Sequence, residues 1–217
     1  MTGIIKICGM REPENIRAVA QTGVTWMGMI FWSGSPRFVS DMSAADAIPE
    51  GITRVGVFVN QPQSEVASIA KTCNLGVVQL HGGETAAYIS VLRPMLPDGC
   101  RIMKAISIGC EADIARADEY QDAADMLLFD TKCTSVGGSG RQFDWDILLR
   151  YDGTLPFLLS GGIGKDDARR IATFSHPRMA GIDLNSRFET APAVKDAVEI
   201  ASFINTFKNI KNTKDNE

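Results

Sequence analysis

The stretch RVGVFVNQPQSEVASIAKTCNLGVVQLH, residues 54–81, contains one complete unit of the predicted fold. Arg54–Asn60 and Gly76–His81 are short apolar runs, which favour strands buried on both faces. Between them, Gln63–Cys73 repeats its apolar residues with a helical period. A helical crossover returns the second strand parallel to the first, so this stretch predicts a strand–helix–strand unit of a parallel sheet.

The same alternation continues along the whole chain in both directions. It predicts eight strands, at Ile4–Cys8, Trp26–Phe31, Arg54–Asn60, Gly76–His81, Arg101–Ile106, Met126–Asp130, Phe157–Ser160 and Ala180–Leu184. Helices are predicted at Pro13–Gln21, Ser43–Ile48, Gln63–Cys73, Glu84–Leu92, Glu111–Tyr120, Trp145–Arg150, Lys165–Thr173 and Ala191–Phe207.

Eight such units in 217 residues leave about 27 residues per unit, which is typical of a compact (βα)8 TIM barrel. The competing architecture is a doubly wound open sheet. That fold usually carries a Gly-rich dinucleotide turn after its first strand, whereas Cys8-Gly9-Met10 lacks this fingerprint. We therefore predict an α/β chain with a single barrel domain over residues 1–207. Residues 208–217 are polar and predict a frayed C-terminal tail.

The composition excludes several classes of function. With 22 Lys plus Arg against 26 Asp plus Glu, the net charge of −4 gives no general attraction to nucleic acid or to an anionic membrane. No apolar run approaches the ~20 residues of a membrane span, and the first ten residues do not resemble a secretory signal. We therefore expect a cytoplasmic protein.

The cysteines and histidines are too few and too scattered to predict a metal site. The five cysteines are odd in number and lack a Cys-x-x-Cys pair, while His81 and His176 lie far apart in the sequence. We expect neither a metal nor a cofactor.

Four polar residues are predicted at the carboxyl ends of strands, where TIM barrels build their active sites. Strand alternation points Cys8, His81, Asp130 and Asp183 into one mouth of the barrel. Each also has a simpler interpretation. The cysteine could be a small buried apolar residue, Asp130 a turn residue, His81 a strand end, and Asp183 a partner for the inward Lys6.

The loops after the last two strands predict a phosphate site. Gly161 and Gly162 follow the seventh strand and precede a helix, while Asn185 and Ser186 follow the eighth. Two ordinary Gly-rich turns are the alternative. The run Gly137–Gly140 is better explained as a mobile flap. Arg37, in the loop after the second strand, could bind a carboxylate with two parallel hydrogen bonds or could be an ordinary surface arginine.

Taken together, these motifs resemble those of the phosphoribosylanthranilate isomerase family. The matching segments run in order along nearly the whole chain: KICG at 6–9, SPRFVS at 35–40, GVFVN at 56–60, QLHG at 79–82, KAI at 104–106, FDT at 129–131, GGSG at 137–140, FDW at 143–145, SGGI at 160–163 and GID at 181–183. The resemblance implies a cofactor-independent Amadori rearrangement of N-(5-phosphoribosyl)anthranilate, a phosphorylated small molecule of tryptophan biosynthesis.

The resemblance also implies roles for individual residues. Asp130 would be the general acid and Cys8 the general base. Arg37 would hold the substrate carboxylate, His81 and Asp183 would support the site, and Gly161, Gly162, Asn185 and Ser186 would lie at the phosphate. From strand geometry, Lys6 lies two residues before Cys8 on the same face and about 6.5 Å deeper, so it is expected to anchor Asp183 and not to act directly on Cys8.

One departure from the family falls after the eighth strand. The family commonly has Ser-Ser-Gly-Val-Glu there, whereas this chain has Asn185-Ser186-Arg187-Phe188-Glu189. Arg187 would be strained if that position required a positive φ, or it could contact the phosphate.

Two rival functions remain. A related isomerase of histidine biosynthesis would be expected to use Asp residues on the first and fifth strands, where this chain has Cys8 and Lys104. A non-catalytic barrel that binds a phosphorylated ligand would lose the acid or the base, and both are present. The oligomeric state expected is a monomer or a homodimer.

Overall fold

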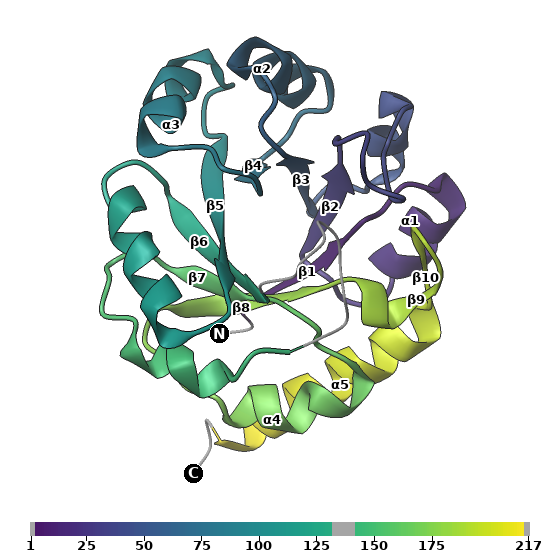
Figure 1. Cartoon of the computed structure of the whole chain (residues 1–217). Helices are drawn as coiled ribbons and strands as arrows, with labels where there is room; N and C mark the ends of the chain where they lie inside the picture. The colour runs from purple at the N-terminus through teal and green to yellow at the C-terminus, as the bar shows by residue number, and fades with distance from the viewer. Residues whose placement is uncertain (1–2, 132–141, 215–217) are drawn as a thin grey trace.

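The computed structural model describes residues 3–131 and 142–214. Eight parallel strands form a closed barrel in chain order, and β8 pairs with β1 to close it (Figure 1). The predicted single-domain TIM barrel is therefore confirmed. The strands are β1 (Ile4–Cys8), β2 (Trp26–Ile30), β3 (Thr53–Phe58), β4 (Val77–Leu80), β5 (Arg101–Ile108), β6 (Met126–Thr131), β7 (Phe157–Leu159) and β8 (Met179–Leu184).

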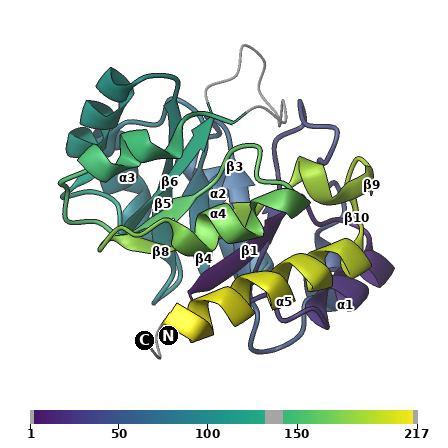
Figure 2. The ribbon, with the colours of Figure 1, turned by 90° about the horizontal axis from the view of Figure 1, so that it is seen from below.

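Helices connect successive strands and surround the barrel, with 3-10 helices labelled η. They are α1 (Pro13–Ala20), η1 (Met42–Ala47), α2 (Gln63–Thr72), α3 (Ala86–Leu92), η2 (Arg93–Met95), η3 (Glu111–Tyr120), η4 (Trp145–Arg150), η5 (Lys165–Asp167) and α4 (Ala168–Thr173). After β8 come η6 (Ser186–Phe188), a hairpin of β9 (Glu189–Ala191) and β10 (Val194–Lys195), and α5 (Ala197–Lys214). Figure 2 shows α4 and α5 side by side, with the hairpin next to α1.

The strands bury two separate apolar layers, as the predicted alternation requires. Ile5 and Ile7 of β1 pack outward in the large core between the strands and the helices. A smaller cluster fills the barrel interior, and it includes Trp26, Val55, Val77, Met103, Met126, Leu128 and Leu158. Side chains with the same alternation reach the carboxyl ends of the strands above this cluster.

Three predicted α-helices are 3-10 helices, namely η1, η3 and η4. At two of them an aspartate favours a tight turn. Asp41 and Asp144 each accept a hydrogen bond from the backbone N–H two residues ahead, at 2.9 and 3.2 Å. Such local contacts compete with regular α-helical hydrogen bonding.

The predicted helix Ala191–Phe207 is wrong at both ends. Residues 191–196 contain the hairpin, where Ala193 has φ 67°, and the helix begins only at Ala197. Asp196 caps it by accepting a hydrogen bond from the Glu199 N–H at 3.0 Å. At the other end, residues 208–214 are helical, because Ile210 packs against the core. The helix therefore extends beyond its predicted end at Phe207.

Lys104, noted on the fifth strand in the comparison with the histidine-pathway isomerase, does not face the barrel interior. Its neighbours Met103 and Ala105 face the barrel interior, so Lys104 points into the outer layer, where it is buried. Its Nζ lies 3.0 Å from Glu84 Oε2. Lys104 is therefore not a site residue of the fifth strand. The predicted flap Gly137–Gly140 lies outside the described residues.

Candidate active site

The four predicted inward residues lie at the carboxyl ends of β1, β4, β6 and β8. Asp183 interacts electrostatically with Lys6, Asp130 and His81. Burial raises the pKa of Asp183, and the Lys6 ammonium opposes that shift. Of the other two residues, Asp130 raises this pKa and His81 lowers it. Asp183 thus connects Cys8 and Lys6 with the His81–Asp130 pair.

Lys6 and Asp183 form a buried ion pair, as predicted. They are direct neighbours in the parallel register of β1 and β8, and Lys6 Nζ lies 2.8 Å from Asp183 Oδ1. Ser160 at the end of β7 adds a hydrogen bond from its Oγ to Asp183 Oδ2 at 3.4 Å. Burial disfavours the Lys6 ammonium, but Asp183 and Cys8 outweigh that effect and raise its pKa.

The expectation that Lys6 is too deep to act on Cys8 is wrong. Both side chains converge on Gly28 of β2, where an added Cβ would lie 3.0 Å from Cys8 Sγ and 3.2 Å from Lys6 Cε. Strand spacing separates the two Cα atoms, but an extended lysine side chain spans that distance. Burial raises the pKa of the Cys8 thiol, and Lys6 and Lys195 both lower it.

His81 and Asp130 form the second half of the site. His81 Nε2 lies 3.3 Å from Asp130 Oδ2, and both side chains are partly exposed. Gln79, two residues earlier on the same face of β4, donates from Nε2 to His81 Nδ1 at 2.7 Å.

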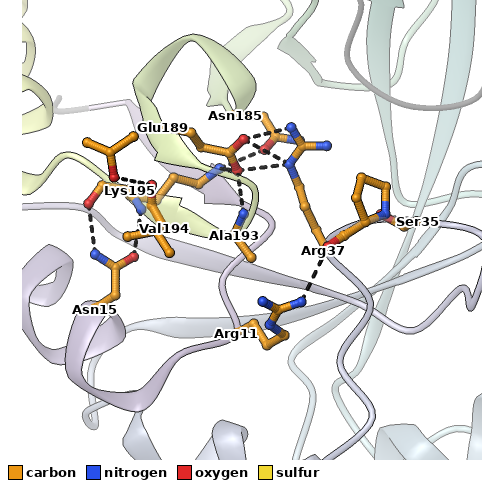
Figure 3. Close-up of polar contacts among 11 residues, drawn as sticks. Arg11, Asn15, Ser35, Arg37, Asn185, Glu189, Ala193, Val194 and Lys195 are labelled. Carbon is orange, nitrogen blue, oxygen red and sulfur yellow. Dashed lines mark hydrogen bonds and ion pairs between the residues drawn. The ribbon is translucent and has the colours of Figure 1, made fainter.

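Arg37 has an internal carboxylate partner that the sequence analysis missed (Figure 3). Its Nε and Nη2 lie 2.8 and 2.6 Å from the two oxygens of Glu189, in a bidentate ion pair. Lys195 Nζ lies 2.6 Å from Glu189 Oε1 and donates to Asn185 Oδ1 at 2.7 Å. Arg37 is thus buried beside the mouth and is not an ordinary surface arginine.

Glu189 and Lys195 were missed because a helix was predicted across the hairpin that carries them. The available signal was Pro192, because a residue that precedes a proline is disfavoured in the α region, which opposes a helix that begins at Ala191.

The loops after β7 and β8 lie against each other, as the phosphate-site prediction requires. Gly161 and Gly162 have φ values of 91° and 67°, which favour glycine. Arg187 Cδ would lie 3.2 Å from a Cβ at Gly164, so Arg187 contacts the other loop. The possibility that Arg187 is strained is wrong, since its φ is not positive. The Asn185 side chain turns toward Lys195, while Ser186 begins η6.

Two general observations concern metals and membranes. Within residues 3–131 and 142–214, no three His, Cys, Asp or Glu side chains are grouped as a metal ion would require. The helices of the same residues include none with the length and apolarity needed to cross a membrane.

This fold and site define the class of protein, a (βα)8-barrel enzyme with candidate acid and base groups at the carboxyl ends of its strands. The family model for N-(5'-phosphoribosyl)anthranilate (PRA) isomerase matches residues 5–206. The chain belongs to this family.

Individual relatives agree with the family match. An N-(5'-phosphoribosyl)anthranilate isomerase of Phocaeicola vulgatus is 46% identical over 94% of this chain and 98% of its own. The crystal structure of phosphoribosyl anthranilate isomerase from Thermotoga maritima has a TM-score of 0.85 at 30% identity, covering 96% and 100% of the two chains. A phosphoribosyl anthranilate isomerase in complex with reduced 1-(o-carboxyphenylamino)-1-deoxyribulose 5-phosphate has a TM-score of 0.81 at 28% identity, with the same coverage.

Proposed function

We propose that this chain catalyses the Amadori rearrangement of N-(5-phosphoribosyl)anthranilate to 1-(2-carboxyphenylamino)-1-deoxyribulose 5-phosphate in tryptophan biosynthesis. The observation that carries the proposal is a row of interacting ionisable side chains across the mouth. It consists of Cys8, Lys6, Asp183, Asp130 and His81. This row puts a candidate base and a candidate acid in one site. The proposed binding partner of the protein is a small phosphorylated substrate.

In the proposed mechanism, Asp130 begins the reaction. In its protonated form Asp130 donates its proton to the furanose ring oxygen, the bond from C1 to that oxygen breaks, and the anthranilate nitrogen forms an iminium with C1. The contact of 3.3 Å between the imidazole and the carboxyl supports this role, because it provides a second group that can hold the proton.

Cys8 completes the rearrangement as the base. Its thiolate removes the proton from C2, and the resulting enolamine tautomerises to the ketone. A buried thiol needs a nearby positive charge to ionise, and Lys6 supplies one from the same strand. Since Asp183 holds Lys6 in place, Asp183 supports the base without touching the substrate.

The remaining site residues are proposed to bind substrate. Arg37 would hold the anthranilate carboxylate, and Gly161, Gly162, Asn185 and Ser186 would surround the phosphate with their backbone groups. All four described cysteines are free thiols, which supports the cytoplasm as the compartment. A monomer or a homodimer stays the prediction for its assembly.

Loss of anthranilate-type fluorescence tests the activity directly. Purified protein is mixed with freshly made phosphoribosylanthranilate in EDTA. We expect rapid turnover by the wild type and a loss of about 10²- to 10⁴-fold in kcat for Cys8→Ser and Asp130→Asn. Cys110→Ser and Asp98→Asn make the same chemical changes at exposed positions and should retain activity. A folded wild type without turnover would refute the function, whereas activity surviving in one variant would refute only that residue's role.

A further inference from the structure

The Glu189 carboxylate lies at the centre of a buried polar cluster beside the mouth (Figure 3). Its side chain is 5% exposed, and it receives the Arg37 guanidinium, the Lys195 ammonium and the Ala193 N–H at 3.2 Å. The two cations share Oε1, since Arg37 contacts both oxygens of the carboxylate and Lys195 contacts Oε1. Glu189 is therefore fixed from three directions.

The cluster has more positive than negative charge. Arg37 and Lys195 provide two cations, and Glu189 provides one carboxylate. The nearby Lys6 is already balanced by Asp183. Because a buried charge requires a partner, the surplus cation can be balanced by the Cys8 thiolate, whose charge acts on both Arg37 and Lys195, and by an anion that joins the cluster from the site.

The cluster touches the strand that carries the proposed base. A Cβ at Gly9, the residue after Cys8, would lie 2.7 Å from Arg37 Cδ, 3.0 Å from Asn185 Oδ1 and 3.4 Å from Lys195 Nζ. A ligand anion at this place would therefore be bound next to the reacting thiol.

Only one edge of the Arg37 guanidinium is used by Glu189. The ion pair engages Nε and Nη2, which leaves the hydrogen atoms of the Nη1/Nη2 edge outside it. A guanidinium can bind a carboxylate on each of these two edges, because its five N–H groups are arranged in a fixed plane. Glu189 thus sets the direction in which the second edge points.

Lys195 is held rigidly enough to fix Glu189. Its side chain is fully buried, and its backbone exchanges two hydrogen bonds with the Asn15 side chain of α1, each 2.8 Å long. The hairpin is thereby tied to the first helix, and the ammonium has little freedom to move.

We propose that Glu189 and Lys195 are positioning residues for substrate recognition. Glu189 orients Arg37 so that its Nη1/Nη2 edge receives the substrate carboxylate, and Lys195 fixes Glu189. This inference rests on the proposed function, and it adds to that function a source of selectivity for carboxylated substrates.

Two ligands that differ only in the carboxylate test the proposal without turnover. The first is reduced 1-(o-carboxyphenylamino)-1-deoxyribulose 5-phosphate, and the second is the corresponding phenylamino compound without the carboxyl group. Calorimetric titration gives Kd for the wild type, Glu189→Gln, Lys195→Met and the control Glu50→Gln, which lies exposed before β3.

We expect Glu189→Gln and Lys195→Met to weaken binding of the carboxylated ligand by about tenfold or more. Both should bind the second ligand within about twofold of the wild type, and in turnover KM should rise with little change in kcat for Glu189→Gln. Lys195→Met should raise KM and also lower kcat, because Lys195 lowers the pKa of Cys8. Glu50→Gln should match the wild type with both ligands.

Equal weakening of both ligands would indicate a merely structural role and overturn the proposal, as would unchanged binding of both. If one variant fails to fold by circular dichroism, the other decides by the same criterion. A wild type that binds the carboxylated ligand but does not turn over substrate would refute the proposed function and leave this inference standing as one about binding.

Discussion

At the scale of single residues, Gly28 makes the contact between Lys6 and Cys8 possible. It lies opposite Cys8 in the register of β1 and β2, and both side chains occupy the space that its missing Cβ leaves. Gly28 does not have a positive φ, so its backbone conformation does not require glycine. The close approach of the two side chains is the reason that this position requires a small residue. Sequence patterns indicate that Gly28 is in a strand, but not that it forms one wall of the thiol's environment.

We expect Gly28→Ala to reduce kcat/KM by about tenfold or more, because a Cβ at 3.0 Å from Cys8 Sγ must displace the thiol. Overpacking should cost about 1–3 kcal/mol in the free energy of unfolding, measured by urea denaturation. In the Cys8→Ala background the same substitution should cost less, because the overlapping sulfur is gone. An additive cost would show that the strain lies elsewhere.

At the scale of elements, another buried ion pair holds the loop that carries His81. Glu84 accepts hydrogen bonds from the backbone N–H groups of Asn60 and Gly82, at 2.7 and 2.9 Å. Lys104 of β5 completes the arrangement by donating to Gly82 O at 2.7 Å as well as pairing with Glu84. The carboxyl ends of β3 and β4 are therefore joined to β5 outside the barrel, next to His81.

Lys104→Met should lower the free energy of unfolding by about 3–5 kcal/mol, because it leaves the Glu84 carboxylate buried without its cation. The loss would be measured by urea denaturation at neutral pH. Arg93→Met is the matched control, since it removes a cation from an exposed pair with Asp125 and should cost about 1 kcal/mol or less. Equal losses for the two variants would contradict the importance of burial.

At the scale of the whole molecule, all three tyrosines have a raised pKa. Burial is the main cause of the raised pKa at each, and it brings that of Tyr88 to about 12. Their hydroxyls donate to main-chain oxygens in different parts of the barrel, Gln61 O, Glu84 O and Leu155 O. Tyrosine ionisation thus reports on the packing of the whole outer layer.

A pKa that is higher in the folded than in the unfolded chain contributes stability below the unfolded value, and this contribution is lost as pH rises through the folded value. For tyrosine the loss begins near pH ~10, the value of an unfolded chain. We expect stability to decline from pH ~10 toward 12, and absorbance at 295 nm to show Tyr88 ionising at about 12 in the folded protein. Ionisation of all three near pH 10 before unfolding would contradict the packing described.

The sequence determined the barrel and the inward row of candidate site residues. Both follow from short-range regularities, because strand alternation fixes which side chains point inward and chain order fixes their neighbours. Cys8, His81, Asp130 and Asp183 were identified in this way, and so was the Lys6–Asp183 pair. The loops after β7 and β8 were likewise predicted to lie together.

Only the tertiary structure decided which partner each buried charged side chain contacts. The reach of Lys6 to Cys8, the outward burial of Lys104 and the capture of Arg37 by Glu189 depend on side-chain lengths and on contacts between residues far apart in the chain. Arg37 and Glu189 are 152 positions apart, so no local pattern pairs them. Periodicity assigns a residue to a face of its element, whereas its partner is set by how the elements pack.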